Sequence, residues 1–121
     1  DRMQIVKGWF GPDGTIAEKV YDVAVAPRPN GVESTVNVDN ASYTNDIGAA
    51  ILTTVWRDPD FDRSIPSFYY LRVIEIPTPR WTAYDVDFFG LDKLPEDVPL
   101  VVQDRAYTSP IWYTPAPHDM N

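Results

Sequence analysis

The chain has 121 residues, the length of one domain, and 44% of them are hydrophobic, as in folded proteins rather than disordered tails. Its formal net charge of −8 argues against nucleic acid as a partner, and no apolar run approaches the roughly 20 residues needed to insert into a membrane. The absence of cysteine excludes disulfides, thiol catalysis and cysteine-ligated zinc.

The first two predicted elements are the strands of a long β-hairpin. Residues 2–10 and 15–26 alternate at period two, and the turn sequence Gly11-Pro12-Asp13-Gly14 separates them. Residues 27–31 then break the pattern.

Five further strands and one helix are predicted in the rest of the chain. The expected strands are residues 33–38, 49–56, 67–76, 98–106 and 109–114, separated by polar loops such as 39–46 and 57–66. Residues 49–56 are mostly apolar on both sides, which predicts a central strand. Residues 82–90 predict a short helix, with Thr82 as its cap and Gly90 at its end.

These elements predict an all-β fold, a β-sandwich of the immunoglobulin or fibronectin type with about seven strands and one short helix. We expect one domain over residues 1–115 and a frayed tail over residues 116–121. The chain starts at Asp1 and has no signal-peptide pattern, so we expect a piece of a longer protein.

An aspartate-rich loop and the single histidine are two features that could carry chemistry of their own. Asp58, Asp60 and Asp62 alternate in one loop and could supply oxygen ligands to calcium, although a solvated turn around Pro59 explains them better, because the EF-hand pattern is missing. The single histidine, His118, lies three residues from the end, where nothing would hold an imidazole for catalysis.

Aromatic residues and one proline-rich turn are the remaining candidates. The four tryptophans Trp9, Trp56, Trp81 and Trp112 could form a sugar-stacking platform, or could belong to the core. Glu75 could serve acid–base chemistry only with a partner that the sequence does not identify. An interface is expected at the turn that ends the strand of residues 67–76, formed by Pro77, Thr78, Pro79, Arg80 and Trp81.

The residues DRMQIVKGW (1–9), EIPTPRW (75–81) and RAYTSPIWY (105–113) carry a family resemblance, supported by VWRDPDFD (55–62) and FYYLRV (68–73). Over residues 1–115 the chain resembles the closing segment of the bacterial family known as domain of unknown function 3604. The resemblance implies a large parent protein, often exported to the periplasm or beyond. It also implies a fold relationship to metal-dependent hydrolases of the polymerase and histidinol phosphatase (PHP) type, whose metal-binding motifs precede this segment.

Neither the resemblance nor the motifs place a catalytic residue or a cofactor on this chain. We therefore expect a non-catalytic accessory domain that packs on the upstream domain of the same polypeptide. Self-association of the isolated domain would follow from exposure of the partner surface. The alternative is a carbohydrate- or calcium-binding β-sandwich module.

Overall fold

The computed structural model describes residues 1–92 and 94–116, and its centre is an antiparallel hairpin. Strand β1 (Arg2–Phe10) pairs with β2 (Ile16–Val25) along its whole length, with one bulge after Met3. The turn between them is closed by hydrogen bonds from the amides of Gly14 and Gly11, and Gly14 has a φ of 81°, which favours glycine. The predicted hairpin is confirmed.

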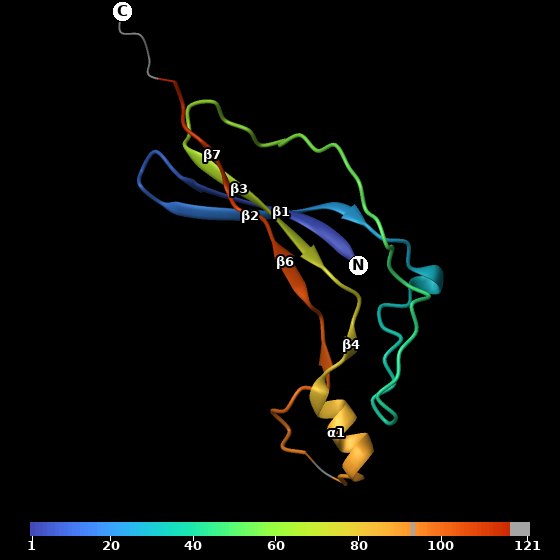
Figure 1. Cartoon of the computed structure of the whole chain (residues 1–121). Coiled ribbons are helices and arrows are strands. Elements are labelled where there is room, and N and C mark those ends of the chain that lie inside the picture. The colour runs from blue at the N-terminus through green and yellow to red at the C-terminus, as the bar shows by residue number, and fades with distance from the viewer. Residues whose placement is uncertain (93, 117–121) are drawn as a thin grey trace, which may run out of the picture.

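Three later strands complete a five-stranded sheet, in which β1 is central. Strand β3 (Ser67–Ile74) pairs antiparallel with β1 on the side opposite β2. Two short strands, β6 (Arg105–Tyr107) and β7 (Ile111–Tyr113), pair with the two ends of β3. The sheet order is therefore β2-β1-β3, with β6 and β7 sharing the outer edge (Figure 1).

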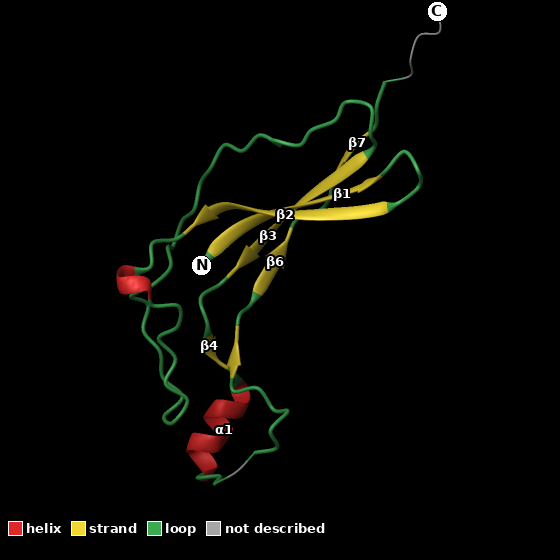
Figure 2. Ribbon diagram, turned by 180° about the vertical axis from the view of Figure 1, so that it is seen from behind, coloured by secondary structure: helices red, strands yellow, loops and turns green. Residues whose placement is uncertain are grey.

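A smaller unit extends from one end of this sheet. Strands β4 (Thr78–Pro79) and β5 (Val101–Val102) form a two-stranded ribbon that leads to helix α1 (Trp81–Phe89) (Figure 2). A 3-10 turn, η1 (Pro29–Gly31), follows β2. None of the described helices has the length and apolar character required to cross a bilayer.

The prediction of an all-β fold with seven strands and one short helix is confirmed, and the two antiparallel sheets are consistent with the sandwich class. Two predicted strands are wrong. Residues 33–38 form only an isolated bridge between Asn37 and Ser42, and residues 49–56 form no strand. Ile51 is 80% exposed and its backbone joins no neighbouring strand, so the apolar alternation of this segment corresponds neither to a buried face nor to a hydrogen-bonded sheet.

The remaining boundaries shift for local reasons. The predicted strand 98–106 is divided into β5 and β6, and the predicted turn at residues 77–79 is instead paired as β4. Helix α1 starts at Trp81, and the Thr82 hydroxyl donates to the carbonyl of Pro99 (2.6 Å) instead of capping the helix. Gly90 ends the helix in the left-handed conformation, as predicted.

The two faces of the five-stranded sheet have different surroundings. Residues 56–61, in the long connection between β2 and β3, lie over one face, which is called the covered face below. This face carries Ile5, Lys7, Trp9, Tyr21 and Tyr69. The open face carries side chains that remain accessible, including Phe10 (57% exposed), Ile16 (81%) and Trp112 (70%).

Candidate functional site

An ion pair between Lys7 and Asp58 lies at the centre of the covered face. The Lys7 Nζ donates to the Asp58 carboxylate at 2.6 Å and to the carbonyl of Asp60 at 2.8 Å. The side chains are only 6% and 7% exposed, so solvent screens this pair little. Lys7 sits in the middle of the central strand, and its charge therefore needs the partner that the loop supplies.

Tyrosine hydroxyls surround this pair. Tyr69 donates to Asp58 (2.8 Å), and Tyr21 donates to Asp60 (2.7 Å), which also pairs with the exposed Lys19. Lys7, Lys19, Tyr21, Asp58, Asp60 and Tyr69 are called the fastening cluster below, because they bind the loop to the sheet.

The fastening cluster shifts the pKa values of its members in directions that the contacts explain. Burial, the largest influence on Asp58, raises the pKa of its carboxyl, but hydrogen bonds from Lys7 and Tyr69 outweigh it and leave that pKa below its ordinary value. The hydrogen bond from Lys19 lowers the pKa of Asp60. Burial and a carboxylate acceptor raise the pKa of both Tyr21 and Tyr69.

The structure does not bring the predicted calcium ligands together. Asp58 and Asp60 bind lysines and tyrosines, while Asp62 accepts hydrogen bonds from the amide and hydroxyl of Ser64. Within residues 1–92 and 94–116, no group of three or more His, Cys, Asp or Glu residues could hold a metal ion. The three carboxylates belong to a turn and to ion pairs.

Two hollows adjoin the fastening cluster. One, of about 400 Å³, is lined by Trp9, Lys19, Asp60, Asp62 and Ser67. The other is an open groove of about 670 Å³ beside β7, lined mainly by aromatic side chains: Trp56, Phe61, Tyr69, Trp112 and Tyr113.

The four tryptophans do not form one platform. Trp56 packs against Tyr21 with ring centroids 5.0 Å apart, and Trp9 has the Lys7 ammonium 5.2 Å from its ring centre. Trp112 lies on the open face against Phe68, and Trp81 is on α1. Of the four, Trp9 and Trp56 are therefore the ones whose rings contact members of the fastening cluster.

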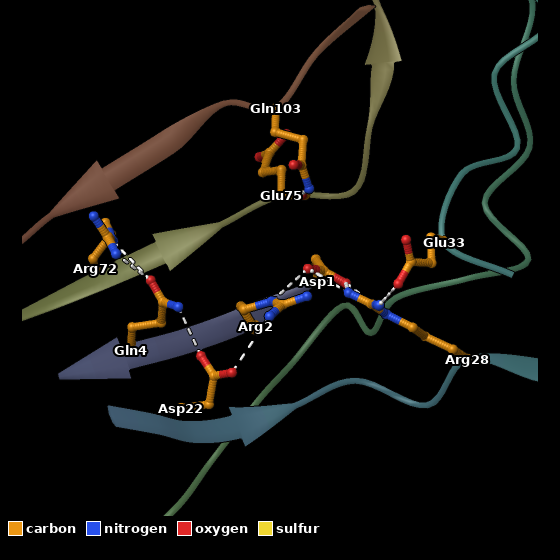
Figure 3. Close-up of polar contacts among 9 residues, drawn as sticks. All are labelled: Asp1, Arg2, Gln4, Asp22, Arg28, Glu33, Arg72, Glu75 and Gln103. Atoms are coloured by element: carbon orange, nitrogen blue, oxygen red, sulfur yellow. Dashed lines mark hydrogen bonds and ion pairs between the residues drawn. The ribbon is translucent and has the colours of Figure 1, made fainter. Parts of the chain in front are cut away.

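A second polar network lies at the other end of β1 (Figure 3). Gln4 joins two charged residues, since its amide oxygen accepts from Arg72 and its amide nitrogen donates to Asp22. Asp1, 3% exposed at its side chain, pairs with both Arg2 and Arg28. Sequence reasoning missed this network, although alternation alone places Gln4 and Arg2 on one face of the strand.

The predicted interface residues fall at the junction of the ribbon and the helix. Pro79 is buried, whereas Trp81 is 63% exposed and lies 5.8 Å from the Arg80 guanidinium. Glu75 is exposed, and its backbone joins Gln103 and Asp104. His118 and most of the predicted frayed tail lie outside the described residues.

The chemistry of the fastening cluster is that of mutual charge neutralisation. Both of its lysines are paired with carboxylates, and among the described residues no buried side-chain polar atom lacks a hydrogen-bond partner. Such an arrangement fixes a loop in position, which is a structural role.

Comparison with known proteins gives one match. The family model described as a protein of unknown function (DUF3604) matches residues 1–115. No curated protein matches the chain, and no solved structure does. Because the match covers nearly the whole sequence, the chain belongs to the DUF3604 family.

Proposed function

We propose that this chain is a non-catalytic accessory domain that packs on another domain of a longer polypeptide. The resemblance described above favours a preceding metal-dependent hydrolase domain of the PHP type as that neighbour. The accessory domain would complete the fold of the hydrolase and shape the surroundings of its active site.

The size of the exposed surface carries this proposal. The chain exposes 9042 Å² of accessible surface, whereas a compact monomer of 13.7 kDa exposes about 6,600 Å². The excess of about 2,400 Å² is larger than the 600–1,500 Å² that domains of one chain typically bury against each other, so it leaves ample surface for a neighbouring domain.

The character of that surface supports the same conclusion. Among residues 1–92 and 94–116, the buried apolar residues are few and mostly small: Val6, Ala26, Ala41, Ile47 and Ala83. Large apolar side chains such as Phe88 (82% exposed) and Trp112 (70%) stay accessible. Apolar area of this extent is typical of a surface that a partner covers.

Comparing the 121-residue chain with the natural-length polypeptide tests the proposal. We expect the chain alone to bind a hydrophobic dye such as ANS and to melt at a lower temperature than the same segment in the longer protein, because binding to the native state stabilises it. Equal melting temperatures without dye binding would reject the accessory role.

A second candidate function is favoured by the hollow beside the fastening cluster. Trp9 offers an aromatic surface, and the carboxylates of Asp60 and Asp62 offer acceptors for hydroxyl groups, a combination that suits a sugar ring. Calorimetry with a panel of glycans tests this candidate, with Trp9→Ala expected to abolish any heat of binding and Trp112→Ala, on the opposite face, to leave it unchanged.

A further inference from the structure

We propose that helix α1 is the docking element of this domain, and that it inserts into an apolar groove bordered by Lys and Arg side chains on the neighbouring domain. This inference rests on the accessory function proposed above, and adds the surface used and the chemistry of the partner.

An aromatic stripe runs along the outer side of α1. Trp81, Tyr84 and Phe88 occupy positions i, i+3 and i+7, which share one face of a helix. Their exposed fractions are 63%, 49% and 82%. Anchors at this spacing are the usual means by which an amphipathic helix enters a groove on another protein.

The opposite side of the helix already has its partners. Thr82 and Ala83 are buried toward β4 and the segment before β5, and the Thr82 hydroxyl bonds to Pro99. The helix is therefore attached to the rest of the domain through the side that carries Thr82 and Ala83, and the aromatic stripe is left exposed. Figures 1 and 2 both show α1 extending from the β4–β5 ribbon, away from the five-stranded sheet.

Helix α1 has nine residues, of which only Thr82 and Ala83 are buried, so contacts within this chain stabilise it weakly. Helices shorter than about 12 residues are marginal in water and depend on tertiary contacts. Aromatic side chains bury about 150–250 Å² each, so covering the exposed parts of the three rings would remove roughly 300–500 Å² from water. That area matches one side of a small interface between domains.

The charges around the stripe define the partner. Asp85 and Asp87 lie on the two sides of the stripe around the helix axis, since they follow Tyr84 by one and three residues. Residues 80–100 hold five carboxylates against two basic side chains. A groove that accepts this helix therefore needs an apolar floor and positively charged edges.

Hydroxyl-radical footprinting of the natural-length polypeptide tests the inference by mass spectrometry. We expect Trp81, Tyr84 and Phe88 to be oxidised about fivefold more slowly than their exposure in this chain predicts, because the centre of an interface excludes water. The double variant Asp85→Lys/Asp87→Lys should restore their oxidation. The matched control, Asp39→Lys/Asp46→Lys, changes two exposed loop acids and should not.

The outcomes separate this inference from the proposed function. Protection of Phe10 and Trp112 but not of the stripe would overturn the role of α1 and leave the accessory function standing. No protection at any apolar site would overturn both. Stripe protection that depends on protein concentration, or that survives the charge reversal, would overturn the proposed basic-edged groove in the same polypeptide.

Discussion

Replacing Asp58 with alanine should be among the most damaging single changes to this chain. The variant leaves the Lys7 ammonium on the covered face, where only 6% of its side chain meets solvent. Removing one member of a buried ion pair costs about 3–5 kcal/mol, because the other charge remains without its partner. Lys7 keeps the carbonyl of Asp60 as an acceptor, so we expect the lower end, about 3 kcal/mol.

Urea unfolding followed by tryptophan fluorescence measures this loss, and an unchanged m-value would show that only stability has changed. For a chain of this length, 3 kcal/mol corresponds to a fall in melting temperature of about 12 °C. The control is Lys19→Met, which breaks an ion pair with both side chains 51% exposed and should cost at most about 1 kcal/mol.

The double variant Lys7→Met/Asp58→Leu shows whether charge coupling is the cause. It removes both charges, so we expect its loss of stability to be well below the sum of the losses in Lys7→Met and Asp58→Leu. If the two single losses add, or if Asp58→Ala costs less than about 1 kcal/mol, the ion pair does not fasten the loop.

Three further predictions concern other parts of the chain. The pKa of Asp58 is lower in the folded state than its unfolded value of about 3.9, so its contribution to stability is complete only about one pH unit above that value and is lost as the pH falls through and below it. The urea midpoint of Asp58→Asn should therefore depend less on pH below about 5 than that of the wild type. Gly8→Ala would place a Cβ in steric overlap with the Phe68 ring and should cost about 1–3 kcal/mol in chemical denaturation, with partial rescue by Phe68→Leu if the clash is the cause. Gly90→Ala imposes a side chain at a φ of 60° and should cost about 1 kcal/mol, seen as faster amide exchange in α1, whereas Gly90→Asn should cost less.

The hairpin and the helix could be predicted because their signals are local. The turn Gly11-Pro12-Asp13-Gly14 lies between two alternating stretches, and Gly90 provides a left-handed helix end. Residues 49–56 alternate equally well, but a strand also requires a neighbour with free backbone groups. Periodicity does not report whether that neighbour exists.

The fastening cluster could be predicted only in part. The carboxylates at Asp58 and Asp60 were visible in the sequence as oxygen ligands, but their partners are lysines 51 and 41 residues away. No local pattern gives such a separation. One signal was present around Lys7 itself, since alternation places it between the apolar Ile5 and Trp9 on one face of the strand, and a charge on an apolar face requires a counter-charge from elsewhere in the fold.

The way the loop is held explains which surfaces remain for a partner. The loop attaches to the covered face through the ring contact of Trp56 with Tyr21 and through charges and hydroxyls, and these polar groups satisfy one another within the described part of the chain. A self-satisfied polar cluster gains little from a further protein surface, because its groups would have to exchange existing hydrogen bonds for new ones. The stripe on α1 and the part of the open sheet face around Phe10 and Trp112 expose apolar area instead, as does Ile51 in the loop, and such area gains free energy when water is removed from it. Docking through the fastening cluster is therefore disfavoured, and docking through α1 or the apolar part of the open face is favoured, by the same distribution of polar and apolar side chains.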